Sequence, residues 1–215
     1  MLGDKVSPGD QVIVNGLPVE PLSTEQVIFI ALNKPVGVVC TADGTDKRNI
    51  IDFVDHRCRV FPVGRLDKDS QGLIFLTNRC DLVDKIVGAD SHHEKEYVVT
   101  VNKPITDEFI ARMSNGVPML GRVTKACKVF KESAFVFRII LVQGLNRQIR
   151  RMCQHYHYSV KKLERIRIMH VDLKSLAAGQ WRQLPEAELS ELIQVLEGPI
   201  HDIDPMIKPV TGKVR

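Results

Sequence analysis

Residues 64–78 read Gly-Arg-Leu-Asp-Lys-Asp-Ser-Gln-Gly-Leu-Ile-Phe-Leu-Thr-Asn and combine a charged loop with an apolar run. A second apolar run, at 60–63, precedes the loop. Short apolar runs bounded by Gly and Asn are typical of interior strands. Because a sheet fixes the geometry of a short connection, a polar loop in this place is suited to chemistry. The side chains that the loop would present are Arg65, Asp67, Lys68, Asp69 and Ser70.

The same loop also fits a solvated connection in which Asp and Ser side chains cap a turn. Its spacing alone does not distinguish this alternative from a functional site. Asp69 lies two positions from Asp67 and is better suited to holding the turn than to serving as a second catalytic acid. A carboxylate hydrolase, which would need such an acid, is therefore disfavoured.

The composition is that of an ordinary globular protein. The 215 residues include 44% hydrophobic and 26% charged residues, with a net charge of +4. There is no run of about 18 apolar residues and no apolar segment typical of a signal peptide, so we expect a cytoplasmic protein without a membrane span. Nothing in the sequence indicates an obligate protein partner, and we expect a monomer.

The cysteines do not predict a disulfide framework or a zinc site. There are five, an odd number, and no two form a Cys-x-x-Cys pair. Cys153, His155 and His157 are spaced two apart, and residues two apart do not share a helix face. We therefore expect no metal.

The chain divides into a main domain with short flanking segments. Residues 1–22 contain turn residues around one alternating strand and are too few to hold a core. Residues 23–26 read as a linker, and an apolar strand at 27–32 opens a domain that we expect to extend over 27–198. Residues 199–215 contain prolines without hydrophobic periodicity and are expected to form a flexible tail.

Periodicity and capping residues predict the other elements. Asn78 is the expected N-cap, and Gly88 the expected end, of the second predicted helix. The expected strands are 97–101, 122–130, 134–142, 159–164 and 166–173. The expected helices are 49–54, 81–87, one capped by Thr106, 146–157 and 185–196. Strands joined by short turns with scattered helices predict the α+β class, with a largely antiparallel sheet and helices packed on it.

Positive charge is concentrated in one segment. Residues 147–167 carry seven basic residues and one acid, a net charge of +6 (7 − 1), which leaves −2 (4 − 6) for the rest of the chain. A local basic field favours binding of a polyanion, although a solvated basic face is the alternative. The basic residues are Arg147, Arg150, Arg151, Lys161, Lys162, Arg165 and Arg167.

The predicted helix 146–157 has an amphipathic pattern. Its buried stripe would contain Ile149, Met152, Cys153 and Tyr156, at i, i+3, i+4 and i+7. Arg147, Arg151 and Gln154 would lie on the far side. Arg150 would lie at the margin, where it could either reach a half-buried carboxylate or extend its head into solvent.

Five segments, in order, resemble signature segments of the RsuA branch of pseudouridine synthases, which modify ribosomal RNA. Residues 64–78 resemble the signature GRLDxxSxGLLLLTN. The others are 33–37 (NKPVG), 95–97 (KEY), 146–152 (NRQIRRM) and 160–165 (VKKLER), and together the segments cover about residues 27–185. Residues 1–22 resemble the closing part of the S4-type RNA-binding domain found in this branch, so we expect an incomplete S4-like domain.

The resemblance implies a bent mixed sheet with an active cleft across its middle. It also implies isomerisation of a specific uridine in structured RNA. The amino-acid sequence of these segments favours large-subunit ribosomal RNA as the substrate, with a transfer-RNA anticodon stem-loop as a second substrate. No cofactor is expected, because substrate and product are isomers.

The chemistry requires an ionised carboxylate. Breaking the bond from N1 to C1′ develops positive charge on the sugar, as in glycoside hydrolysis. A carboxylate can stabilise this charge or add to the sugar covalently, and a cationic partner keeps it ionised. By resemblance, Asp67 is the carboxylate and Arg150 is its partner.

The resemblance also assigns residues around the base. Tyr97 would stack on the uracil and assist removal of the C5 proton, although a strand tyrosine is more often a core residue. Leu163 would line the uracil pocket. The uridine must leave its stack to reach Asp67, and Arg65 would fill the vacated space or hold a phosphate. The expected contacts to the RNA backbone are Lys34, Arg147, Arg151, Lys161, Lys162, Arg165 and Arg167.

A non-catalytic ribosome-assembly or RNA-binding protein on the same fold is the alternative from another functional class. A protein that had abandoned catalysis would be expected to lose part of the catalytic set. The presence of Asp67, Tyr97 and Arg150 together therefore favours the enzyme.

Overall fold

A computed structural model describes residues 12–14, 17–19, 27–41, 46–88 and 91–197. The strands are β1 Val12–Val14, β2 Leu17–Val19, β3 Phe29–Lys34, β4 Phe61–Val63, β5 Gln71–Thr77, β6 Lys95–Val101, β7 Pro118–Met119, β8 Arg122–Val123, β9 Lys128–Lys131, β10 Val136–Leu141, β11 Val160–Ile168, β12 Val171–Asp172 and β13 Trp181–Gln183. The helices are α1 Ile50–Val54, the 3₁₀ turn η1 Cys80–Leu82, α2 Val83–Val87, α3 Asp107–Ser114, α4 Gln148–His155 and α5 Glu186–Glu197.

In these described ranges a nine-stranded mixed sheet runs in the order β13-β3-β5-β11-β6-β10-β9, with β4 paired to β5 and β12 to β11. The pairing of β5 with β11 is parallel, and the other pairings described for this sheet are antiparallel. The predicted α+β fold with a largely antiparallel sheet is therefore confirmed.

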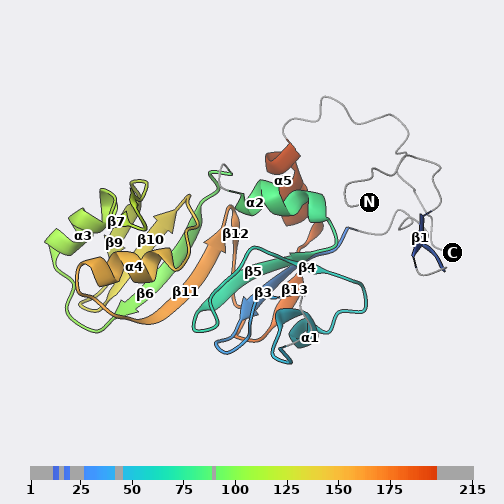
Figure 1. Cartoon of the computed structure of the whole chain (residues 1–215), viewed down its shortest axis with the longest axis horizontal. Helices are drawn as coiled ribbons and strands as arrows, with labels where there is room; N and C mark the ends of the chain where they lie inside the picture. The colour runs from blue at the N-terminus through green and yellow to red at the C-terminus, as the bar shows by residue number, and fades with distance from the viewer. Residues whose placement is uncertain (1–11, 15–16, 20–26, 42–45, 89–90, 198–215) are drawn as a thin grey trace.

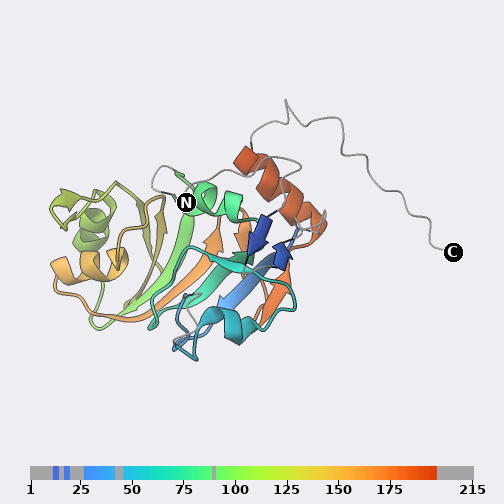
Figure 2. The same ribbon diagram turned by 45° about the vertical axis from the view of Figure 1, so that its right-hand side comes forward.

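The sheet supports two halves that lie side by side (Figure 1). In one half, α3 and α4 pack on β6, β9 and β10 around a core that includes Val99, Phe137 and Met152. In the other half, α1 contributes Ile50 to a core on one face of β3 and β5. The helices α2 and α5 lie next to each other in both ribbon views and cover the opposite face, where Phe75 is buried (Figure 2).

The two halves meet where β5 begins. Gln71 and Gly72 of β5 pair with Glu164 and Arg165 of β11, and this short parallel register joins the halves through the sheet. The charged loop 65–70 directly precedes β5, so the fold places the loop at the junction between the two halves.

Local sequence signals account for several boundaries. The apolar runs at 60–63 and 73–76 form β4 and β5, which pair antiparallel. The Asn49 side chain accepts hydrogen bonds from the first turn of α1, and Thr106 caps α3 as predicted. The cap predicted at Asn78 is wrong, because its Oδ1 accepts from the amide of Ile28 and the next helical turn begins at η1. Gly88 does end α2.

Two strand predictions need correction. The strand predicted at 122–130 is interrupted and forms β8 and β9. The strands predicted at 159–164 and 166–173 instead form one strand, β11, with an irregularity between Arg165 and Arg167. The chain then turns at Met169, whose φ is 53°, and enters β12.

The predictions for the flanking segments lie mostly outside the described residues. Within residues 1–22, β1 and β2 form an antiparallel hairpin, which includes the strand expected there. The linker at 23–26 and the tail at 199–215 are not among the described residues. None of the helices in the described ranges has both the length and the apolar composition needed to span a bilayer.

Candidate active site

The loop 65–70 is held by backbone contacts on both sides. The amide of Ser70 donates to the carbonyl oxygen of Asp67 at 3.0 Å, which closes a turn. The amide of Gly37 donates to the carbonyl oxygen of Lys68 at 2.8 Å. The amide of Leu66 donates to Sγ of Cys40 at 3.4 Å. The segment 33–40 therefore supports the loop that carries Asp67.

Lys34 has a structural position within this support. Its side chain is fully buried, and Nζ donates to the carbonyl oxygens of Pro35 and Val38 at 2.9 Å each. Burial lowers the pKa of the ammonium group. Because Lys34 does not reach the surface, the prediction that it contacts the RNA backbone is wrong.

The helix α4 points its N-terminal end at the same loop. Ile149, Met152 and Cys153 are buried and Tyr156 packs partly buried against the same core, which confirms the predicted stripe. Arg147 precedes the helix with φ at 48°, a left-handed conformation that is uncommon for a non-glycine residue.

Arg150 reaches the loop from the margin of the stripe. Its Nη2 donates to the carbonyl oxygen of Asp69 and to Oγ of Ser70, both at 3.0 Å. Its Nε lies 3.6 Å from Oδ2 of Asp67, within ion-pair distance but too far for a hydrogen bond. The structure thus brings Asp67 and Arg150 together.

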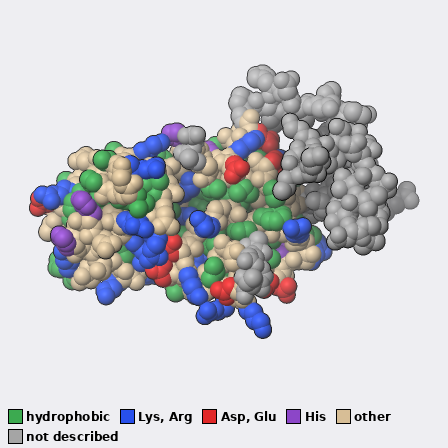
Figure 3. Space-filling view, in the orientation of Figure 1, with side chains coloured by type: hydrophobic (Ala, Val, Ile, Leu, Met, Phe, Trp, Pro, Cys, Tyr) green, Lys and Arg blue, Asp and Glu red, His purple; other side chains and the backbone are tan. Residues whose placement is uncertain are grey.

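Arg147 also belongs to this cluster, although the helical pattern placed it on the far side. Its Nη1 and Nη2 donate to Oδ1 and Oδ2 of Asp69 at 3.1 and 3.2 Å, and Nη1 lies 3.2 Å from Oδ2 of Asp67. Figure 3 shows basic side chains gathered beside acidic ones near the middle of one face.

The charges of the cluster affect the Asp69 carboxylate. Burial by itself raises the pKa of Asp69, but the hydrogen bond from Arg147 and the charges of Arg150 and Arg147 outweigh it and lower that pKa. Asp69 is therefore ionised at neutral pH and remains available as a partner for both arginines.

Tyr97 and Leu163 lie on the neighbouring strands β6 and β11. Tyr97 is half-buried and packs against the cores of both halves, one of which includes Leu66 of the loop. Leu163 pairs with Val99 of β6 and is buried in the core beneath α4. The two side chains thus approach the junction from the half that carries α4.

Arg165 is buried at the junction instead of lying on the surface. Its side chain is enclosed, and Nε donates to the carbonyl oxygen of Leu73 at 2.6 Å. Its Nη2 is buried without a hydrogen-bond partner among the described residues. Because this side chain is buried and bonds β11 to β5, the prediction that Arg165 contacts RNA is wrong.

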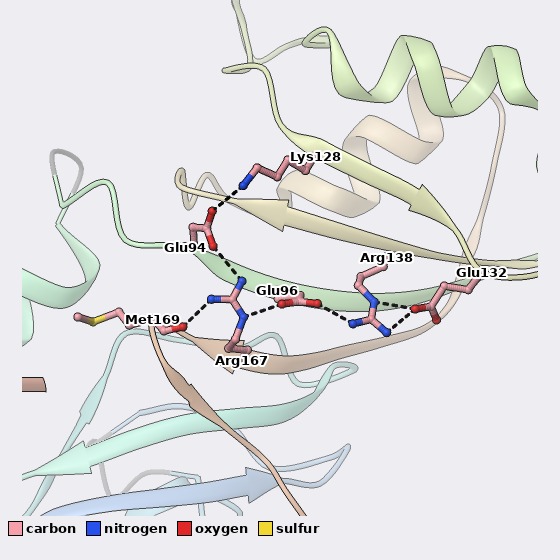
Figure 4. Close-up of polar contacts among 7 residues, drawn as sticks. All are labelled: Glu94, Glu96, Lys128, Glu132, Arg138, Arg167 and Met169. Atoms are coloured by element: carbon pink, nitrogen blue, oxygen red, sulfur yellow. Dashed lines mark hydrogen bonds and ion pairs between the residues drawn. The ribbon is translucent and has the colours of Figure 1, made fainter. Parts of the chain in front are cut away.

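Arg167 forms part of a chain of alternating charges (Figure 4). Its Nε and Nη2 donate to Glu96 and Glu94 at 2.6 and 2.9 Å. The other oxygen of Glu96 accepts from Arg138 at 2.8 Å. Because Glu96 adjoins Tyr97 along β6, its side chain lies on the opposite face of the sheet. The RNA contact predicted for Arg167 is therefore not supported.

The remaining predicted RNA contacts differ in position. Lys161 and Arg65 are exposed, and Arg151 is half-buried with bonds to Asn146. Lys162 is exposed but pairs with Glu164 at 2.7 Å, and it alternates with Leu163 along β11. It therefore faces away from α4 and from the cluster around Asp67.

The sequence reasoning missed the contacts of Asp69 and Ser70 with the two arginines. The available signal was the spacing of Arg147 and Arg150, because residues three apart lie on neighbouring parts of a helix surface. In the described part of the chain, no group of three or more His, Cys, Asp or Glu side chains is arranged to hold a metal ion.

Comparison with known proteins gives a consistent assignment. The sequence matches the RNA pseudouridylate synthase family over residues 28–155. It is 60% identical to the dual-specificity RNA pseudouridine synthase RluF of Escherichia coli (strain K12), over 100% of this chain and 74% of that protein. It is 31% identical to the ribosomal large subunit pseudouridine synthase B of Bacillus subtilis (strain 168), over 89% of this chain and 80% of that protein.

A solved structure agrees with these sequence matches. A crystal structure of a pseudouridylate synthase superimposes with a TM-score of 0.72 at 29% identity, covering 78% of this chain and 74% of that one. The expected resemblance to the RsuA branch is confirmed. Within that branch the sequence of the five segments favours RluF, and the 60% identity confirms this assignment. The chain therefore belongs to the RNA pseudouridylate synthase family, whose members are isomerases that convert uridine to pseudouridine in RNA.

Proposed function

We propose that Asp67 is the catalytic carboxylate for this isomerisation and that Arg150 is its cationic partner. The observation that carries the proposal is the position of Asp67. Its side chain is 30% exposed, it lies at the junction of the two halves, and it has arginine nitrogens at 3.2 and 3.6 Å. Two positive charges thus lie beside a carboxylate that stays partly exposed and accessible to substrate.

The reaction needs one carboxylate and a closed space. The bond from N1 to C1′ breaks with its electron pair on the uracil, while Asp67 stabilises or binds the sugar carbon. The uracil turns and C5 bonds to C1′. Any bond from Asp67 to C1′ breaks at this step and its electron pair returns to the carboxylate. The proton on C5 is then lost, and N1 gains a proton. Overall the nucleoside neither gains nor loses atoms or electrons, because substrate and product are isomers. The half-buried side chain of Tyr97 and the core around Leu163 support their proposed places beside the uracil.

Four of the predicted basic side chains, three of them exposed and one half-buried, are the proposed RNA contacts. The flipped uridine would enter beside Asp67, with Arg65 available for the vacated space or a phosphate. Phosphate contacts would position the RNA without reading its sequence. The residues in this set are Arg65, Arg147, Arg151 and Lys161.

We propose large-subunit ribosomal RNA as substrate and a transfer-RNA anticodon stem-loop as a second one. The name of the Bacillus subtilis relative, a ribosomal large subunit enzyme, supports the first substrate, and the dual specificity named for RluF supports a second. We also propose that residues 27–198 form the catalytic domain and that the enzyme acts as a monomer in the cytoplasm, where bacterial ribosomal RNA is made.

The test is release of tritium from RNA labelled at uracil C5. C5 loses its hydrogen only when the new carbon–carbon bond forms there. Ribosomal RNA and an anticodon stem-loop are each incubated with the wild type and with Asp67→Asn. We expect release by the wild type from both RNAs and none by the variant.

Other outcomes have distinct meanings. Release by Asp67→Asn equal to the wild type would remove Asp67 from the catalytic role. Release from one RNA would limit the substrate proposal to that RNA. If neither RNA releases tritium although both bind, the alternative of a non-catalytic RNA-binding protein would be favoured.

A further inference from the structure

The two arginines beside Asp67 approach the same carboxylate oxygen. Nη1 of Arg147 lies 3.2 Å and Nε of Arg150 lies 3.6 Å from Oδ2. In both ion pairs Oδ2 is therefore the oxygen of Asp67 that lies nearest to the arginine. Both positive charges thus lie closest to the Oδ2 side of the carboxylate, and Oδ1 is the oxygen better placed to face a substrate atom.

The position of Arg147 depends on a second carboxylate. Guanidinium groups favour two parallel bonds to one carboxylate, and Arg147 makes such a pair with Asp69. The closest approach of Arg147 to Asp67 is through Nη1. Without the Asp69 carboxylate, the same fork would be free to engage both oxygens of Asp67.

Asp69 itself is held in place by the loop. Nη2 of Arg150 donates to its carbonyl oxygen and to Oγ of Ser70. Ser70 is buried, and its amide closes the turn onto Asp67. The two acidic residues therefore keep a fixed relation to each other, and Arg147 reaches both from the start of α4.

We propose that Asp69 is a positioning residue for the reaction: it holds the Arg147 guanidinium on the Oδ2 side of Asp67, so that Oδ1 stays open to the target ribose. The inference rests on the proposed function of Asp67. It gives Asp69 a role beyond holding the turn, because the negative charge of its side chain is required. The lowered pKa of Asp69 agrees with this role.

The first test is the variant Asp69→Asn, which keeps the shape of the side chain and removes its charge. We expect kcat at saturating RNA to fall by about tenfold to a hundredfold, the range for a small misplacement of a reacting group. RNA affinity should be unchanged or higher, since a negative charge has been removed. Asp69→Glu should recover part of kcat.

A matched control is available in Asp81→Asn. Asp81 also accepts two bonds from one arginine, Arg79, at 2.8 and 2.6 Å, but it lies on η1 outside the cluster. The loss of the Asp81 charge in Asp81→Asn should leave kcat unchanged. Equal kcat for Asp69→Asn and the wild type would overturn the positioning role.

The second test separates positioning from a purely structural effect. If the loss in Asp69→Asn comes from Arg147 covering Asp67, removing Arg147 as well should relieve it. We expect the double variant Asp69→Asn/Arg147→Gln to have the same kcat as Arg147→Gln alone. Both should have a higher kcat than Asp69→Asn. A double variant as slow as Asp69→Asn, or slower, would overturn the proposal.

The outcome is separable from failure of the proposed function. Tritium release by the wild type and its absence in Asp67→Asn test that function first. Thermal unfolding of each Asp69 and Arg147 variant confirms that it is folded before its kcat is compared. If Asp67→Asn proves inactive while the double variant shows no relief, only the role of Asp69 is lost.

Discussion

A Cβ atom placed on Gly72 would lie 2.2 Å from the carbonyl oxygen of Arg165 and 2.4 Å from its amide nitrogen. The two backbones therefore meet at a distance that only glycine allows. In addition, the φ of Gly72 is +115°, a backbone conformation that other residues rarely adopt. This contact sets how closely the loop carrying Asp67 approaches β11.

We predict that Gly72→Ala destabilises the protein by more than about 3 kcal/mol, because rigid backbone atoms would have to move. Gly121→Ala is the control, since Gly121 also has a positive φ but nothing lies within 4 Å of the added carbon. It should cost about 1 kcal/mol from backbone strain alone. Urea unfolding measures both, and equal losses would show that the approach to Arg165 is not limiting.

Replacing Arg150 by Lys should reduce kcat by about a hundredfold while the protein remains folded. Lysine keeps the charge but cannot donate to Asp69 and Ser70 while also reaching Asp67. Arg151→Lys is the matched control on the next position of α4. Single-turnover tritium release at saturating RNA distinguishes them, and similar rates for the two variants would contradict the role of Arg150.

The salt dependence of RNA binding should distinguish basic residues that contact the RNA from those on the opposite face of β11. Arg151→Gln and Lys161→Gln should each reduce the slope of log K against log[salt] by about 0.7 to 0.9, the value for one lost phosphate contact. Lys162→Gln should leave the slope unchanged, because Lys162 faces the opposite side of β11. Fluorescence anisotropy with a labelled RNA measures the slopes. An equal change for Lys162 would contradict the assigned face.

The destabilising effect of the buried Lys95 should decrease as the pH rises above 8, so the free energy of unfolding should increase. Burial, with a contribution from the charge of Arg165, lowers the pKa of Lys95 from 10.5 to about 8. Between these values the unfolded chain binds more protons than the folded one, so the stability contribution of this group increases with pH. Below pH 8 the buried ammonium group is charged, and the full cost of burying it lowers the free energy of unfolding.

The variant Lys95→Met removes this penalty. At pH 7 we expect it to be about 1–3 kcal/mol more stable than the wild type, after allowance for partial solvent screening. The difference should shrink as the pH is raised towards 10.5. Urea unfolding at several pH values provides the comparison, and a difference that does not vary with pH would exclude titration of Lys95 as its cause.

Local sequence patterns predicted the parts of the structure that depend on neighbouring residues. The apolar runs on either side of the loop became β4 and β5, and the stripe through Ile149 and Met152 became the buried face of α4. The cap was predicted correctly where the side chain bonds within its own turn, as at Thr106. At Asn78 a bond to the distant Ile28 overrode the local signal.

The basic residues show why part of the site could not be predicted in this way. Lys34 ends a strand that is buried throughout, so alternation does not indicate where its side chain points. The irregularity after Arg165 breaks the alternation along β11. The pair of Arg147 with Asp69 joins residues 78 positions apart, and no local pattern selects one carboxylate over another at that separation.

The order of the strands along the chain has a consequence for synthesis and folding. The half that contains α3 and α4 draws its core from the continuous segment 97–163, whereas the other half needs β3 to β5 and also β12, β13 and α5. The bond between Arg165 and Leu73 joins positions 92 apart. Because closing such a long loop costs entropy, this junction should form late. Catalytic competence should therefore arise only after most of the chain has left the ribosome, and in refolding it should lag behind secondary structure.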